Sequence, residues 1–200
     1  LGADALGGAV NFITDKGQEG TGGSISHMIG DFNTSRSTMS LNYAGDSGFF
    51  SRLSGFYDYS DNNYEVDATI PSRLGETIPY KAERFHDAYK GQGANVDVGY
   101  TEQSWADLFQ VGLYTSEYNK EIQHNVTMSK VYGEATIERK TYGLNLRYKK
   151  QLTDELSLSA TAGASELKSH FSDTTDYFYL WNGERGMEEV PHLPHNYYHY

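Results

Sequence analysis

Residues 141–150 read TYGLNLRYKK, a stretch in which apolar and polar side chains alternate. Neighbouring side chains of a β-strand point to opposite faces, so a repeat of two predicts an extended segment with one apolar and one polar face. The apolar set is Tyr142, Leu144, Leu146 and Tyr148, and the polar set is Gly143, Asn145, Arg147 and Lys149. The stretch therefore predicts a strand whose two faces meet different surroundings.

The same alternation recurs along most of the chain, whereas the 3.6-residue period of an amphipathic helix is hard to find. Six further segments show it: 22–30, 37–45, 49–59, 93–100, 108–118 and 156–168. Within these segments Phe56 breaks the polar side of its strand. We therefore expect an all-β protein, with about seven strands in this chain.

The connections between the predicted strands are of two kinds. Short polar turns are expected at 45–48 (GDSG), 101–107 (TEQSWAD) and 152–155 (LTDE). The other connections are expected to be longer: 31–36 (DFNTSR), 60–89, 119–140 and the residues after about 169. Because the two kinds alternate, an antiparallel sheet would carry all its short turns at one end and all its long loops at the other. Outer-membrane β-barrels have this layout.

Aromatic side chains gather near both ends of the predicted strands. The set beside the short turns is Tyr43, Phe49, Tyr100, Trp105 and Tyr148, and the set beside the long loops is Tyr57, Tyr59, Tyr89, Tyr118 and Tyr142. Amphipathic rings favour the headgroup level of a bilayer, so these sets predict the two aromatic girdles of a transmembrane barrel.

A water-soluble β-sandwich is the alternative, because its strands also alternate and its core also holds aromatic residues. Two features favour the barrel. The segments have the length of about 9 to 11 residues that a tilted membrane-spanning strand needs. Their polar sides also carry charges, at Arg52, Asp58, Asp97, Arg147 and Lys149. We therefore predict an antiparallel transmembrane β-barrel.

Composition excludes several classes of protein. The 200 residues include 27 acidic and 16 basic side chains, for a formal net charge of −11. Nucleic acid is not an expected partner, because there is no Lys/Arg cluster to displace phosphate counterions. The chain has no cysteine, which excludes disulfides and thiolate metal sites. The mean hydropathy of −0.64 suits a spanning barrel, since only alternate side chains of its strands contact lipid.

The segment before the first predicted strand, residues 2–14, reads GADALGGAVNFIT. It resembles the closing segment of the plug domain in TonB-dependent outer-membrane receptors, where a small-residue turn and a Gly-Gly pair precede a short strand. The matching positions are Gly7, Gly8, Val10, Asn11, Ile13 and Thr14. Glycine suits such a segment, because a residue without Cβ lets the backbone approach the barrel wall closely.

The resemblance implies a fold, a location and a function. In the whole protein it implies a 22-stranded barrel in the outer membrane of a Gram-negative bacterium, filled by an N-terminal plug. Residues 1–16 would end the plug, residues 17–21 would form a hinge, and residues 22–200 would form the N-terminal part of the barrel. This chain would then be an excerpt of a longer protein. The family imports a scarce ligand, such as a siderophore, haem, cobalamin or an oligosaccharide, using energy delivered by the TonB complex.

Aromatic and histidine side chains in the long loops are the candidate ligand contacts. They are Tyr64, Tyr80, Phe85, Tyr177, Tyr179, Trp181, His192, His195 and Tyr198. Such rings could stack on a planar or sugar ligand, or pack the loops over the pore. The histidines could bind haem or metal, but a Tyr/His-rich loop with another role is the favoured interpretation, because Pro191 and Pro194 oppose a helix there.

Neither a metal site nor a cofactor is predicted. The acidic residues of the second long loop are Asp61, Glu65, Asp67, Glu76, Glu83 and Asp87. They lack the spacing of a calcium loop, which favours a solvated acidic surface. Catalytic signatures such as G-x-S-x-G and H-E-x-x-H are absent from the sequence. We therefore expect a transporter, not an enzyme; a passive porin and a barrel enzyme are the alternatives.

Overall fold

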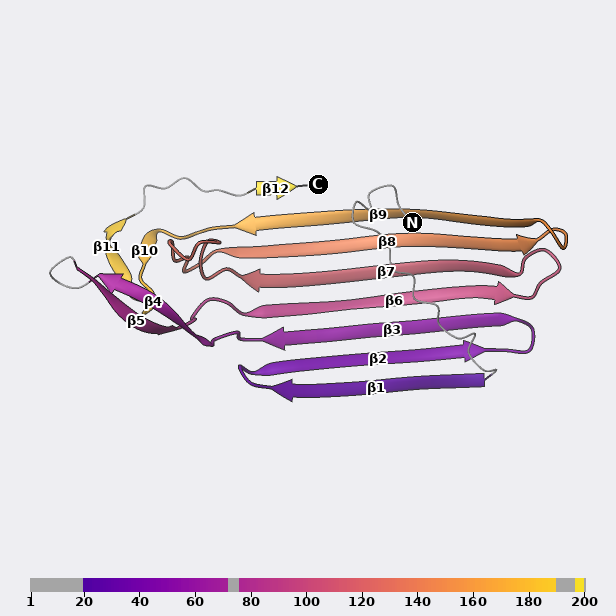
Figure 1. Cartoon of the computed structure of the whole chain (residues 1–200), viewed down its shortest axis with the longest axis horizontal. Coiled ribbons are helices and arrows are strands. Elements are labelled where there is room, and N and C mark those ends of the chain that lie inside the picture. Colours follow the sequence, from indigo (N-terminus) through magenta and orange to yellow (C-terminus); the bar gives the residue numbers. More distant parts are fainter. Residues whose placement is uncertain (1–19, 72–75, 190–196, 200) are drawn as a thin grey trace.

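The computed structural model describes residues 20–71, 76–189 and 197–199, and these residues form strands joined by turns and loops (Figure 1). The strands are β1 (Gly20–Gly30), β2 (Thr34–Ala44), β3 (Phe49–Ser60), β4 (Glu65–Pro71), β5 (Thr77–Glu83), β6 (Tyr89–Thr101), β7 (Leu108–Glu121), β8 (Thr136–Gln151), β9 (Ser157–Ser172), β10 (Tyr177–Tyr179), β11 (Arg185–Glu189) and β12 (Tyr197–His199). The described part of the chain contains no helix, and so none that could span a membrane. The predicted all-β class is confirmed.

Seven long strands form one antiparallel sheet in the order β1-β2-β3-β6-β7-β8-β9, and the short β12 pairs with the far edge of β9. Figure 1 shows the long strands side by side. Each lies next to its predecessor among the long strands, as expected for an up-and-down sheet. The expectation of about seven antiparallel strands is therefore confirmed.

The register gives the sheet two chemically distinct faces. Leu41, Leu53, Val96, Leu113 and Leu144 lie directly opposite one another on successive strands. We call the face that bears this row the apolar face. One residue along, the row is Asn42, Arg52, Asp97, Gly112 and Asn145, and we call that side the polar face. The two predicted sets of alternating residues therefore lie on opposite faces of one sheet.

The connections also separate the two ends of the sheet. Residues 45–48, 102–107 and 152–156 join strands at what we call the turn end. Residues 61–71, 76–88, 122–135 and 173–189 lie at the opposite end, the loop end (Figure 1). The predicted separation of short and long connections is confirmed for these segments.

The first connection at the loop end contradicts the expected long loop at 31–36. Residues 31–33 form a tight turn, in which Phe32 and Asn33 have φ values of 59° and 54°. Two consecutive residues in the left-handed region give the turn geometry that matches the twist of a hairpin. The Thr34 amide then donates to the Asp31 carbonyl at 3.1 Å, so residues 34–36 belong to β2. At this joint the loop-end connection is no longer than the turn-end ones.

Two other boundaries differ from expectation. β1 begins at Gly20, inside the segment 17–21 that we predicted as a hinge. β8 and β9 contain 16 residues each, more than the predicted length, because their pairing continues to Thr136 and Ser172 at the loop end. The long strands thus extend beyond the segments in which apolar and polar residues alternate most clearly.

The long connections contain two hairpins that we did not predict. β4 pairs with β5, and β10 pairs with β11. Ala82 in β5 packs with Val131 and Trp181 in a small hydrophobic core. Around this core lie Val66, Ala68, Ile70, Tyr80, Met128 and Tyr179. Residues 61–71, 76–88, 122–135 and 173–189 thus form a folded unit at the loop end, which we call the loop cap.

Candidate functional site

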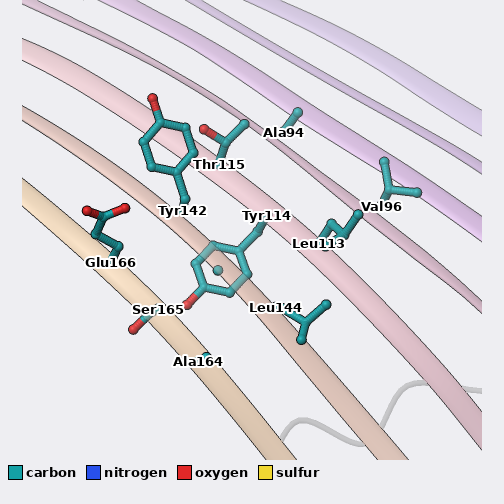
Figure 2. A pocket seen from close by; sticks show the side chains of 11 residues that line it. Ala94, Val96, Leu113, Tyr114, Thr115, Tyr142, Leu144, Ala164, Ser165 and Glu166 are labelled. Atoms are coloured by element: carbon teal, nitrogen blue, oxygen red, sulfur yellow. The ribbon is translucent and has the colours of Figure 1, made fainter.

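On the central strands β6 and β7 the apolar face is the more exposed of the two. Leu113 is 55% exposed and Leu144 is 45% exposed, although both are large apolar residues in the middle of their strands. Figure 2 shows them beside Val96 on neighbouring strands, where they line a shallow apolar depression. Among the described strands, all contacts are between hydrogen-bonded neighbours, so no second sheet covers this face. A water-soluble sandwich would bury such a face against another sheet.

The polar face is packed more tightly. Gln110 is only 9% exposed, and its amide donates to Asp97 Oδ1 at 2.7 Å. Asn95 donates to the other oxygen of Asp97 at 2.8 Å. The ring of Tyr114 covers Gly143 so closely that a Cβ added there would lie 2.1 Å from Tyr114 Cζ. On the central strands β6 to β8, hydrogen bonds and a ring seated over glycine therefore pack part of the polar face.

At the turn end, the predicted aromatic set comes together on the apolar face. Ring centroids lie 5.4 Å apart for Phe49 and Tyr100, 6.4 Å for Tyr100 and Trp105, and 5.5 Å for Trp105 and Phe109. The hydroxyl of Tyr148 donates to the Trp105 carbonyl at 2.7 Å. These contacts make a continuous aromatic belt, because neighbouring rings on adjacent strands meet edge to face.

The second predicted girdle, at the loop end, is wrong as a single belt. Tyr89 and Tyr118 lie on the polar face, with ring centroids 5.9 Å apart. Tyr57, Tyr59 and Tyr142 lie on the apolar face. The prediction used only how near each residue is to a strand end and did not consider which face its side chain is on. A shift of one residue along a strand moves a side chain to the other face.

Toward the loop end, the side chains on the apolar face change from apolar to charged. Lys140 Nζ lies 3.2 Å from Glu117 Oε1 and 2.9 Å from Glu138 Oε1. The aromatic belt and these charges bound a band that is about 27 Å long along the strand from Tyr148 to Lys140. At a tilt of about 40° its height is about 20 Å, close to the apolar band of outer-membrane barrels.

The loop cap contains a pocket of about 580 Å³, which we call the cap pocket. It lies where the ends of β3, β5 and β7 meet the turn that contains Trp181. Three predicted ligand residues, Tyr80, Phe85 and Trp181, line it. Its other lining residues are Tyr59, Asp61, Asn63, Glu83, Arg84, Ala88, Glu121 and Asn182.

The remaining predicted aromatic residues of the cap surround this pocket without lining it. The Arg84 guanidinium donates to the Tyr64 hydroxyl and lies 4.8 Å from the centre of the Tyr64 ring. Arg185 lies 4.9 Å from the ring centre of Tyr177. The hydroxyl of Tyr179 donates to Glu134 at 2.9 Å, and burial together with this hydrogen bond raises the pKa of Tyr179. These rings support the cap.

Several predicted residues lie outside the described part of the chain. They are His192 and His195 in the loop, and Gly7, Gly8, Val10, Asn11, Ile13 and Thr14 in the plug-like segment. Tyr198 belongs to β12, where its backbone lies opposite His170 of β9. Among the described residues no group of histidines and carboxylates is arranged to hold a metal ion.

Polar residues that the sequence did not single out hold the cap in place. Asp87 is buried and forms ion pairs with Arg84 Nη1 at 2.9 Å and with Lys120 Nζ at 2.6 Å. Gln123 Oε1 accepts the backbone amides of Phe85 at 2.9 Å and His86 at 2.6 Å. For Asp87 the predicted solvated acidic surface is wrong, because the two cations compensate for its burial.

A second pocket of about 390 Å³ opens at the loop end beside Arg36 and Asp58, which lie on the polar face. Its other lining residues are Thr34, Ser35, Tyr59, Ser60, Asn62, Tyr89 and Lys120. Arg36 Nε donates to Asp58 Oδ1 at 2.7 Å. This pocket places hydrogen-bonding groups of both charges at the loop end of the sheet.

No protein-family profile, no curated protein and no solved structure matches this chain. The function is therefore argued from the residues and from the geometry of the sheet and its cap.

Proposed function

We propose that this chain is part of a TonB-dependent outer-membrane receptor that imports a scarce ligand. The seven long strands are, in this proposal, about a third of the wall of a 22-stranded barrel, and residues 1–16 end the plug. The single observation that carries the proposal is the inverted packing in the middle of the sheet: Leu113 and Leu144 are exposed, whereas Gln110 is buried. Lipid is the solvent in which exposed leucine and an interior row of hydrogen-bonded polar groups are both favourable.

The proposed orientation follows from the two ends of the sheet. The turn end faces the periplasm, as the short turns of such barrels do, and the loop cap faces the cell exterior. The aromatic belt at Phe49, Tyr100 and Trp105 then lies at the inner headgroup level. The ion pairs of Lys140 lie at the outer boundary of the lipid. A ligand captured outside would pass along the polar face once the plug has moved.

The proposal requires no covalent chemistry and no resident cofactor from these residues. The loop end supplies aromatic rings and polar groups that can hold a siderophore, haem, cobalamin or an oligosaccharide. The partners are the TonB complex, which supplies the energy, and the lipid that contacts the apolar face; nucleic acid is not among them. The resemblance of residues 2–14 to a plug segment distinguishes this function from that of a passive porin or a barrel enzyme.

Uptake measurements test the proposal. A strain that lacks the receptor, and one that lacks TonB, would be grown on single sources of iron, cobalamin or glycan and compared with the parent. We expect both deletions to abolish growth on the same source, because import depends on the receptor and on TonB. Growth that needs the receptor but not TonB would indicate a passive porin. Unchanged growth on every source would contradict import.

A further inference from the structure

The cap pocket combines two kinds of chemistry in one concave site. Aromatic rings come from β3, from β5, from the chain after β5 and from the turn between β10 and β11: Tyr59, Tyr80, Phe85 and Trp181. Oxygen and amide groups come from Asp61, Asn63, Glu83, Glu121 and Asn182. Ligand sites typically pair apolar surface with a few convergent polar groups that set orientation. The cap pocket has this composition, and it is assembled from two connections of the sheet and from the ends of β3 and β7.

Two of its carboxylates are held in place by neighbours. Asn63 donates to Glu83 Oε1 at 2.7 Å, and the hydroxyl of Tyr59 donates to Asp61 Oδ1 at 2.6 Å. Each of these bonds engages one oxygen of a carboxylate, which has two oxygens and several lone pairs. The carboxylates are thus oriented and retain the capacity to accept further hydrogen bonds.

A buried cation in the wall leaves a donor unsatisfied. The side chain of Arg84 is only 10% exposed, and it pairs with Asp87 at 2.9 Å. Its buried Nε–H has no hydrogen-bond partner among the residues that the structure describes. This nitrogen is enclosed and both Nη atoms are already engaged, so Arg84 forms part of the wall of the pocket.

The charge of the pocket restricts the class of ligand. Asp61, Glu83 and Glu121 line it, against the single cation Arg84, whose charge Asp87 already neutralises. Anionic ligands, such as ferric carboxylate chelates and the propionates of haem, would be repelled. A neutral sugar avoids this penalty: its hydroxyls donate to carboxylates and accept from N–H groups, and its C–H face packs on aromatic rings.

We propose that the cap pocket binds a segment of a neutral oligosaccharide. Phe85, which is 41% exposed, offers flat apolar surface, and Glu83 and Asp61 accept from sugar hydroxyls. Import after binding rests on the proposed function, and within that function the inference selects glycans over anionic iron chelates. Binding itself requires only the pocket.

Binding by the full-length receptor in detergent tests the inference. The receptor would first be screened for binding to an array of neutral and anionic oligosaccharides. Titration calorimetry would then measure its Kd for the strongest neutral binder and for ferric citrate. We expect a neutral glycan to bind and ferric citrate not to bind. Phe85→Ala should raise the Kd about tenfold, as for loss of an aromatic anchor, and Glu83→Gln about fivefold, as for loss of charge-assisted hydrogen bonds.

The loop cap offers a matched control for each variant. Phe178 is as exposed as Phe85, at 44% against 41%, but does not line the pocket. Glu65 lies directly opposite Glu83 in the β4–β5 hairpin and also lies outside the lining. Phe178→Ala and Glu65→Gln should leave the Kd within about twofold, as for neutral surface substitutions. Near-ultraviolet circular dichroism would check that each variant is folded.

Two results would overturn the inference: no neutral glycan on the array binds, or Phe85→Ala and Glu83→Gln behave like their controls. The proposed function fails separately. TonB-dependent uptake of iron without glycan binding would remove the glycan site and keep the receptor. Glycan binding that depends on Phe85, without TonB-dependent uptake, would keep the site and remove the transporter.

Discussion

Gly143 and Leu144 are neighbours in β8, and they illustrate how differently the two faces of the sheet are built. Leu144 is large and exposed on the apolar face, whereas Gly143 is covered by the Tyr114 ring on the polar face. In water these patterns would be reversed, because burial of leucine stabilises a soluble fold. The difference teaches that large apolar side chains are left uncovered on one face while close packing lies on the other, and contact of the apolar face with lipid is our proposal for this contrast. Four substitutions test this contrast.

A charge on the apolar face should have the largest effect. Leu144→Arg should prevent barrel assembly, because arginine near the bilayer midplane costs about 2 to 4 kcal/mol. The measurement is the heat-modifiable electrophoretic mobility of the receptor in outer-membrane fractions. Asn145→Arg is the matched control, since Asn145 is the next residue and lies on the polar face. Normal assembly of Leu144→Arg would contradict the lipid-facing orientation.

A methyl group on the polar face should have the next largest effect. In Gly143→Ala the new Cβ would lie 2.1 Å from Tyr114 Cζ, so the ring must move. Overpacking of this kind costs about 1 to 3 kcal/mol, measurable by urea unfolding in detergent. Gly163→Ala is the control, because its Cβ would meet its nearest neighbour, the Leu144 carbonyl oxygen, at an ordinary 3.5 Å. Equal stability of the two variants would show that the ring is not closely seated.

Removal of the central acceptor on the polar face should cost somewhat less. Asp97→Ala leaves the side-chain amides of Asn95 and Gln110 without the acceptor that they share. We expect a loss of about 1 to 2 kcal/mol in the free energy of unfolding, as for unsatisfied polar groups. Asp97→Asn, which keeps one acceptor oxygen, should lose less. If Asp97→Ala is as stable as the parent, water in the lumen replaces the carboxylate.

Removal of the Arg36–Asp58 ion pair at the loop end should have the smallest effect. Arg36 pairs with Asp58 at 2.7 Å, but its side chain is more than half exposed. Exposed pairs contribute about 0 to 1 kcal/mol and are screened by salt. Arg36→Ala should therefore change the free energy of unfolding by less than about 1 kcal/mol, and the difference should shrink in high salt. A larger, salt-independent loss would mean that the pair is buried in the assembled barrel.

The strands could be predicted because their signal is local. Alternation within 141–150 specifies which residues share a face, and the paired strands keep that assignment. Phe56, the exception on the polar side, has a tertiary explanation: its ring lies over Gly93 of β6, where a Cβ would come within 2.6 Å of the ring. The hairpin β4–β5 also carried a readable alternation, at Val66, Ala68 and Ile70, but the segment 60–89 was treated as one loop.

The candidate site could be predicted only in part. Aromatic content drew attention to Tyr80, Phe85 and Trp181, which do meet at the cap pocket. Tyr64 and Tyr177, chosen by the same criterion, are engaged instead by Arg84 and Arg185. Composition identifies the residues that can stack on a ligand. Which of them line the pocket depends on how two distant connections pack against the ends of β3 and β7.

The amino-acid sequence alone determined the all-β class, the two faces of each strand and most of the separation between short and long connections. Local periodicity and turn chemistry were enough for these features. Side-chain direction in a strand repeats every second residue, whatever the neighbouring strands are. Long-range packing established the burial of Asp87 between Arg84 and Lys120, the seating of Tyr114 over Gly143 and the shape of the cap pocket. These features join residues far apart in the chain, and their energies depend on distances and burial that exist only after the chain has folded.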